Sequence, residues 1–186
     1  LSNINIFLAI CLLIIAFCIG PMQTTLKTIV NGVGLYISNF VSDSLKLDPY
    51  GENIWIYTWR VFYWAWWITW SPFVGVFIAR ISKGRTIREF VAGVILVPSI
   101  ACMIWFGVFG SLALNVVNLF SIDALTSMAV NPETALYIIF NKYSIGTLLS
   151  IISIIVLLIF FITSADSAIF VIGMMSSKGD LNPKNY

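Results

Sequence analysis

Long apolar runs alternate with short polar segments along this chain, and the length of the runs predicts the structure. A spanning helix needs about 20 mostly apolar residues, and four runs meet that length: residues 4–22, 54–80, 90–118 and 144–175. The first and third runs contain no charged residue, and the fourth contains only Asp166. The pattern predicts an all-α membrane protein with four spanning helices.

Residues 24–42 follow a different pattern, in which apolar side chains such as Ile29 and Val33 recur every three or four positions. This spacing is typical of a helix with one apolar face. Gly32 and Gly34 weaken the expectation, because a glycine inside a helix costs about 1 kcal/mol relative to alanine. We still expect an amphipathic helix here, lying on the membrane surface or on the helix bundle.

Basic residues crowd the short loop between the second and third apolar runs. The loop holds Arg80, Lys83, Arg85 and Arg88. Because lysine and arginine accumulate in cytoplasmic loops, we expect this loop to face the cytoplasm. With four spans, residue 1 and residues 176–186 are then cytoplasmic, while residues 23–53 and 119–143 lie outside. We interpret the basic loop mainly as an orientation signal, with gating or contact with anionic lipid as a second role.

The composition agrees with a membrane protein and removes several classes of function. Hydrophobic residues make up 60% of the chain, charged residues make up 10%, and the mean hydropathy is +0.98. Soluble domains carry about 25% charged residues. The chain has no histidine, and its three cysteines lie in apolar runs without metal-type spacing. No phosphate-binding loop, nucleophile elbow or zinc motif occurs, so we expect neither an enzyme nor a nucleic-acid partner.

The densest feature of the sequence is an aromatic cluster in the second apolar run. Between Trp55 and Phe73, ten of nineteen residues are aromatic, and six of the seven tryptophans lie there. The same stretch contains no carboxylate. Ring faces without a nearby anion suit a cation that cannot donate hydrogen bonds, such as a quaternary ammonium, which gains about 0.5–2 kcal/mol per ring. An aromatic belt at the membrane interface is the alternative, but the density favours a binding face.

Helical periodicity, at about 100° per residue, gathers several of these rings on one broad face. They are the rings of Trp59, Tyr63, Trp66, Trp67 and Trp70, whereas Trp64 points elsewhere. Pro72 follows, and its neighbours Ser71 and Gly75 favour a break or bend of the helix. Transporters bind substrates at such interruptions in the middle of the membrane, and a plain proline kink is the alternative.

Thr163 and Ser164 place two adjacent hydroxyl groups inside the last apolar run. Hard cations such as Na⁺ take oxygen ligands, and a freed backbone carbonyl, for instance that of Phe160, would add a third. The alternative is a hydrogen bond from each hydroxyl to a carbonyl one turn earlier. Asp166 follows closely, and it fits a functional acid facing the bundle interior or a cytoplasmic cap or ion pair.

Small residues in the third apolar run predict close packing of that helix against a neighbour. They are Gly107, Gly110 and Ser111.

Three motifs give the chain a resemblance to a known family. They are Trp64-Ala65-Trp66-Trp67-Ile68-Thr69-Trp70-Ser71-Pro72-Phe73-Val74-Gly75, the segment from Ala79 to Phe90, and Phe161-Ile162-Thr163-Ser164-Ala165-Asp166-Ser167. Together they resemble the betaine/carnitine/choline transporter family, over the whole chain. The resemblance implies part of a leucine-transporter-type inverted-repeat helix bundle. Because the chain lacks an initial methionine and stops in a polar segment, we interpret residues 1–186 as a fragment of a single transporter domain.

The resemblance also implies two partial binding sites. A box for a trimethylammonium group would use Trp66, Trp67 and Trp70, with Phe73 nearby. A Na⁺ site would use Thr163 and Ser164, with Phe160 adjacent. The other half of each site would lie on spans that this sequence does not contain. Thr69 stands where the family often has serine, a conservative change that leaves the box intact.

The function implied by the resemblance is secondary transport of glycine betaine, choline or carnitine across the cell membrane, by symport with Na⁺ and in support of osmoprotection. Na⁺ would be the coupling ion, and no other cofactor is expected. The partners would be the substrate, Na⁺ and the lipid bilayer, with a homo-oligomer also compatible. Two alternatives remain: a Na⁺-independent substrate exchanger with the same fold, and a membrane structural or assembly module.

Overall fold

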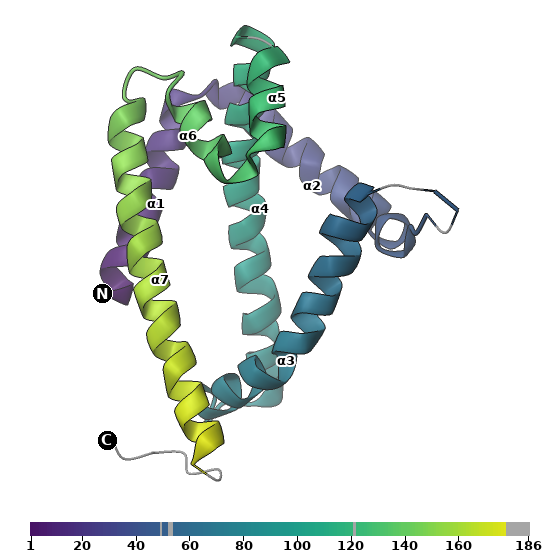
Figure 1. Cartoon of the computed structure of the whole chain (residues 1–186), viewed down its shortest axis with the longest axis vertical. Coiled ribbons are helices and arrows are strands. Elements are labelled where there is room, and N and C mark those ends of the chain that lie inside the picture. The colour runs from purple at the N-terminus through teal and green to yellow at the C-terminus, as the bar shows by residue number, and fades with distance from the viewer. Residues whose placement is uncertain (49, 52–53, 121, 178–186) are drawn as a thin grey trace. The chain divides into compact units, whose positions relative to one another are not determined.

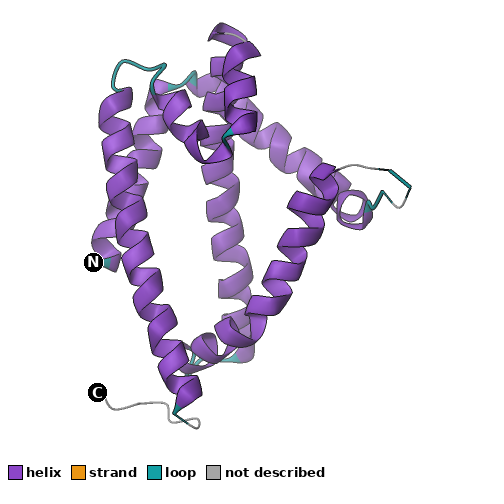
Figure 2. Ribbon diagram, viewed as in Figure 1, coloured by secondary structure: helices purple, strands orange, loops and turns teal. Residues whose placement is uncertain are grey.

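The computed structural model describes residues 1–48, 50–51, 54–120 and 122–177, and every regular element within them is helical (Figures 1 and 2). The α-helices are α1 (Ser2–Ile19), α2 (Met22–Leu45), α3 (Phe62–Ile81), α4 (Ile87–Phe120), α5 (Ile122–Val130), α6 (Ala135–Phe140) and α7 (Gly146–Ser176). A π-helical turn, Ile56–Val61, leads directly into α3, and a short 3₁₀ turn, Pro132–Thr134, precedes α6.

Four stretches of the described residues are long and apolar enough to cross a membrane. They are Ser2–Ile19, Ile56–Ile81, Ile87–Val116 and Gly146–Ser176. The expected cytoplasmic position of residues 178–186 lies outside the described residues, and the orientation of the spans stays a prediction.

Local sequence explains where the helices around the basic loop end and begin. Gly84 has φ +91°, a left-handed conformation that glycine adopts without a steric penalty, and it turns the chain between α3 and α4. A capping box then starts α4. In it the Glu89 amide donates to Thr86 Oγ1 at 3.3 Å, and the Thr86 amide donates to Glu89 Oε2 at 3.2 Å.

Contacts divide the chain into two compact units. The first comprises Leu1–Ile37 and Ile95–Ala165, and the second comprises Ser38–Val94 and Asp166–Tyr186.

The core of the first unit lies where α1, α4, α6 and α7 meet. Its buried residues are Leu12, Ala16, Val108, Phe109, Leu112, Val116, Ile139, Phe140 and Leu149. Phe109 contacts Phe140 edge-on, with ring centroids 6.1 Å apart. Gly146 lies so close to the carbonyl of Phe140 that a side chain there would collide with the backbone.

Helix α2 packs on α4 through small residues, in accord with two of the three predicted packing positions. The hydroxyls of Thr25 and Ser111 form a buried hydrogen bond of 3.1 Å. A Cβ atom at Gly107 would collide with the side chain of Ile29, so the close approach requires glycine. A Cβ atom at Gly110 would meet nothing within 4 Å among the described residues. The first half of α2 therefore rests on the bundle.

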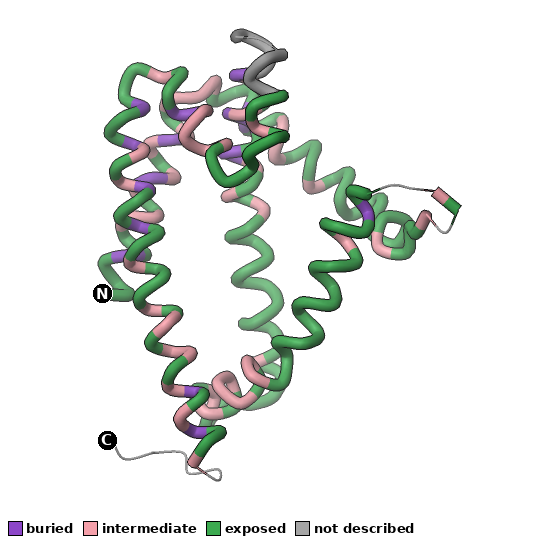
Figure 3. Tube along the Cα trace, in the orientation of Figure 1, coloured by how far each residue is buried: buried purple, intermediate pink, exposed green. Residues whose placement is uncertain are grey.

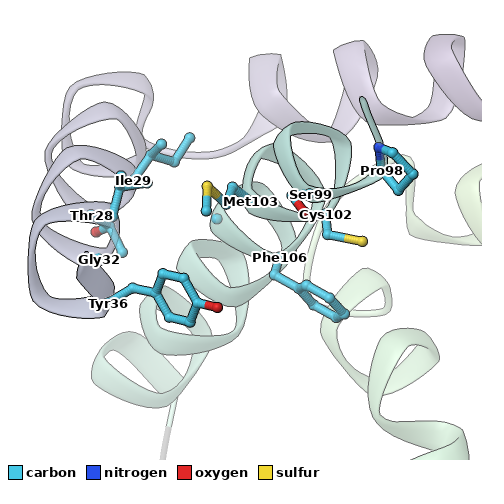
Figure 4. Close-up of a pocket in the computed structure, with 11 residues that line it drawn as sticks. Thr28, Ile29, Gly32, Tyr36, Pro98, Ser99, Cys102, Met103 and Phe106 are labelled. Atoms are coloured by element: carbon cyan, nitrogen blue, oxygen red, sulfur yellow. The ribbon is translucent and has the colours of Figure 1, made fainter. Parts of the chain in front are cut away.

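Beyond the contact at Gly107, an apolar groove of about 560 Å³ separates α2 from α4 (Figure 4). Ile29, Gly32 and Tyr36 line it from α2, and Met103 and Phe106 line it from α4.

In the second unit, α3 has no buried residue, and most of its length is exposed (Figure 3). Most of its aromatic side chains are therefore exposed within the described part of the chain, while Phe73 and Phe77 are half-buried.

Candidate functional site

Six aromatic side chains form a continuous row along α3 and the π-helical turn before it. This aromatic row consists of Trp59, Phe62, Tyr63, Trp66, Trp70 and Phe73. Neighbouring ring centroids in the row lie 5.5–6.2 Å apart. Trp66 and Trp70 stack with an interplanar angle of 3°. Most of these contacts join residues three or four positions apart, which are neighbours on a helical surface.

The structure brings together three of the four residues predicted for a substrate box. Trp66, Trp70 and Phe73 are consecutive members of the aromatic row. Trp67 is 65% exposed and joins none of the ring contacts of the described chain, so it does not extend the row as the helical projection predicted. Trp64 likewise stands apart, as predicted. The role of all four predicted residues in binding stays a prediction.

The aromatic row offers ring faces and no anion. Trp66 and Trp70 remain 48% and 42% exposed, and α3 contains no acidic residue. Such a surface attracts a cation through the ring quadrupoles and gives N–H donors of a ligand no carboxylate to pair with. Because all six rings lie on one helical segment, the row can form only one wall of a cage.

Of the break or bend expected at Pro72, no break occurs, because helix α3 continues through the proline. Two hydroxyl groups in the turn before the proline bond to carbonyls of earlier residues. Thr69 Oγ1 donates to the carbonyl of Ala65, and Ser71 Oγ donates to the carbonyl of Ile68, each at 2.8 Å. These bonds lie within the segment that carries Trp66 and Trp70.

The π-helical turn Ile56–Val61 carries the first ring of the row and was not expected from the sequence. Two hydrogen bonds join it to the chain that follows α2. Arg60 Nη1 donates to the carbonyl of Lys46 at 2.6 Å, and the Tyr57 hydroxyl donates to the carbonyl of Asp48 at 3.0 Å. Single π-helical turns often occur at functional sites. A projection at about 100° per residue does not hold through this turn.

The hydroxyl pair of α7, Thr163 and Ser164, lies in an unbroken helix. Thr163 Oγ1 donates to the carbonyls of Ile159 and Phe160, at 3.0 and 3.1 Å. The carbonyl of Phe160 is therefore not freed by a helix break. The Thr163 hydroxyl and that carbonyl nevertheless place two oxygen atoms 3.1 Å apart. The hydroxyl oxygen keeps lone pairs that could serve as an ion ligand.

The neighbours of the hydroxyl pair give it little enclosure. Ser164 and Asp166 are both exposed, while Thr163 is half-buried. Phe160 lines an apolar groove together with residues of α1 and α4, such as Leu13 and Trp105. The described surroundings therefore leave the hydroxyl pair only partly enclosed.

Arg80 differs from the other basic residues of the loop after α3. Its guanidinium lies over the ring of Phe170 at 4.1 Å, and its Nη1 is 3.4 Å from the sulfur of Met174. Lys83, Arg85 and Arg88 are exposed. Arg80 thus joins the end of α3 to α7, a contact that the interpretation as an orientation signal did not include.

Sequence reasoning also missed Phe62 and Pro98. Phe62 belongs to the aromatic row, and its position four residues before Trp66 would have predicted that the two rings are neighbours on one helix. Pro98 lies inside α4, where the helix likewise continues. The Thr86-x-x-Glu89 pattern of the capping box was also visible in the sequence.

Comparison with known proteins gives a match over the whole chain. The family model described as betaine/carnitine/choline family transporter matches residues 1–186. The chain is 43% identical over 187 residues to the glycine betaine transporter OpuD of Bacillus subtilis, covering 100% of this chain and 36% of that protein. It is 45% identical over 186 residues to the ectoine/hydroxyectoine transporter of Virgibacillus pantothenticus, covering 98% and 36%.

A third relative is glycine betaine transporter 1 of Vibrio parahaemolyticus, which is 40% identical over 188 residues, covering 98% of this chain and 34% of that protein. The chain thus spans about a third of the length of these relatives.

Proposed function

Because the chain belongs to the betaine/carnitine/choline transporter family, we propose that the whole protein carries a small trimethylammonium solute, such as glycine betaine, choline or carnitine, into the cell. The family comprises multi-pass helical transporters of the leucine-transporter type, not enzymes. Family membership alone does not fix the substrate, and the chain spans only about a third of its relatives.

The observation that carries the proposal is the aromatic row without an anion. A trimethylammonium group has no N–H, so it needs no acceptor and gains from contact with several ring faces. Trp66, Trp70 and Phe73 supply adjacent faces on one helix. The other wall of the cage would come from parts of the protein beyond this sequence.

A second candidate substrate follows from the relative named an ectoine/hydroxyectoine transporter. Ectoine carries a delocalised cation that still has N–H donors, and it therefore benefits from a carboxylate or carbonyl acceptor. The aromatic row has no acidic residue on its own helix, which favours the trimethylammonium solute over ectoine.

For coupling, we propose Na⁺ symport, with Phe160, Thr163 and Ser164 as part of the ion site. The support is the pair of oxygen atoms, Thr163 hydroxyl and Phe160 carbonyl, that lie 3.1 Å apart. Hard cations take such oxygen ligands. Na⁺-independent exchange is the rival reaction. A structural or assembly module has no support among the relatives, which are transporters.

Transport by the full-length protein in liposomes tests the proposal. We expect uptake of radiolabelled glycine betaine that depends on a Na⁺ gradient, and weaker competition by ectoine than by choline or carnitine. Uptake that is equal with and without Na⁺ would favour exchange. Strong competition by ectoine, with none by any trimethylammonium solute, would overturn the substrate assignment.

A further inference from the structure

Pro72 leaves one backbone carbonyl of α3 without its usual partner. In an α-helix each amide donates to the carbonyl four residues earlier, so residue 72 would donate to the carbonyl of Ile68. Proline has no amide hydrogen. The middle of a membrane offers no water to replace the lost bond, so the free carbonyl has to be satisfied by the protein.

The hydroxyl of Ser71 bonds to this same carbonyl. Ser71 Oγ donates to the carbonyl of Ile68 at 2.8 Å. Serine and threonine in helices often bond to a carbonyl three or four residues earlier. Here the acceptor is the carbonyl that Pro72 cannot serve, and the side chain takes the place of the missing amide.

A second proline in the chain offers a matched contrast. Pro98 lies inside α4 and is also next to a serine, Ser99. Ser99 Oγ donates to the carbonyl of Ile95 at 2.6 Å. That carbonyl lies four residues before Ser99, whose own amide can serve it. The Ser99 hydroxyl is thus an addition to a helical bond, whereas the Ser71 hydroxyl is a replacement for one.

The repaired turn lies inside the aromatic row. Trp66 and Trp70 precede Pro72 and stack at 6.0 Å, and Phe73 follows it with its centroid 5.5 Å from that of Trp70. The contact between Trp70 and Phe73 therefore joins residues on either side of Pro72. If the Ile68 carbonyl lost its donor, the turn would open, and the angle between Phe73 and the two tryptophans would change.

We propose that Ser71 is a positioning residue of the substrate site. Its hydroxyl holds the helical turn at Pro72 closed and thereby keeps Phe73 in register with Trp66 and Trp70. The inference rests on the proposed role of the aromatic row in binding a trimethylammonium group. It adds a residue whose side chain bonds to the backbone and acts on the ligand only through the rings.

A double-mutant cycle in the full-length transporter tests the proposal. Ser71→Ala should weaken glycine betaine affinity about fivefold or more, the effect of leaving one carbonyl without a donor. Ser71→Thr should restore most of the affinity, because threonine can donate the same bond. Pro72→Ala returns an amide to the Ile68 carbonyl. In that background Ser71→Ala should therefore change affinity by less than about twofold.

Ser99→Ala is the matched control, and we expect affinity to be unchanged. Tryptophan fluorescence during titration with glycine betaine measures the affinity. Size-exclusion chromatography of each variant measures the yield of folded protein. If Ser71→Ala alone does not fold, the Ser71→Ala/Pro72→Ala variant should fold and bind with the affinity of Pro72→Ala. Failure of that double variant to recover would overturn the proposal.

Trp70→Leu in the same titration separates the two claims. If Trp70→Leu leaves the affinity unchanged, the aromatic row does not bind the substrate, and the proposed function fails. Two results would show that Ser71 is not the positioning residue. In the first, Trp70→Leu weakens binding but Ser71→Ala does not. In the second, Ser71→Ala weakens binding by the same factor in the unmodified protein and in the Pro72→Ala variant.

Discussion

The aromatic row of α3 and the hydroxyl pair of α7 are both partial sites, but they differ in how much of their chemistry one helix can supply. The row offers accessible ring faces, and Trp66 and Trp70 are still nearly half exposed. The hydroxyl of Thr163 already donates to two carbonyls of its own helix. A ring face needs no further group to attract a cation, whereas an ion shell needs several oxygens at once.

The difference shows which kind of site a short chain can reveal. A surface built from ring faces can be identified on a single helix from residue spacing and the lack of anions. A hydroxyl pair becomes an ion site only when other segments supply ligands, and until then it is hard to distinguish from ordinary hydroxyl bonding to the backbone.

Replacing a central ring should have the largest effect. We expect Trp70→Leu in the full-length protein to weaken glycine betaine affinity about 5- to 30-fold, equivalent to about 1–2 kcal/mol for one desolvated cation–π contact. The concentration for half-maximal uptake measures this change. Trp64→Leu, outside the aromatic row, is the control and should matter much less. Equal losses in both variants would mean that general packing explains the aromatic cluster.

Removing one hydroxyl of the pair should change the Na⁺ dependence. We expect Thr163→Ala to raise the Na⁺ concentration for half-maximal uptake about fivefold, because one oxygen ligand is lost. Substrate affinity should largely recover at saturating Na⁺, since excess ion restores the binding-competent state by linkage. Uptake measured against Na⁺ concentration gives both values.

Asp166→Asn provides a contrast for the hydroxyl pair. If Asp166 is structural, this variant should lower the yield of folded protein without shifting the Na⁺ dependence. An unchanged Na⁺ dependence in both Thr163→Ala and Ser164→Ala would remove the pair from the ion site and leave backbone bonding as its explanation.

The smallest effect is expected at Trp67, where the resemblance and the structure differ. Trp67 is exposed and lies outside the ring contacts of the described chain. If α3 alone decides its role, Trp67→Leu should change glycine betaine affinity by about twofold or less, as for an exposed site. A loss as large as that of Trp70→Leu would show that Trp67 completes the cage with another part of the protein.

Much of the helical architecture follows from pattern, because long apolar runs and helical periodicity act within one segment. The same reasoning failed where a single neighbouring bond decides the outcome. Pro72 suggested a break or bend, but the helix is not broken there, and the Ser71 hydroxyl bonds to the carbonyl that lost its amide donor. The π-helical turn at Ile56–Val61 has no comparable sequence signal. Trp59 nevertheless stacks on Tyr63, as the helical projection predicted.

The sequence also could not predict which residues pack against which neighbouring helix. Gly107 and Gly110 look alike as small residues, but among the residues that the structure describes only Gly107 meets a neighbour, the side chain of Ile29. Which of the two glycines contacts α2 depends on the direction in which α2 crosses α4. The spacing of residues within α4 gives no information about that direction. The candidate site divides in the same way. Spacing placed Trp66 and Trp70 on one face, and the resemblance added Phe73. Spacing could not complete an ion shell around Thr163.

The most direct test of the central claim is whether the positive charge of the ligand, and not its shape, is what the aromatic row recognises. Tert-butylacetate has the shape of glycine betaine but carries carbon in place of the charged nitrogen. In fluorescence titrations of the full-length protein, we expect glycine betaine to bind and tert-butylacetate to bind at least about fivefold more weakly, with Trp70→Leu narrowing the gap. Equal affinity for both ligands in the unmodified protein would contradict recognition of the cation by the aromatic row.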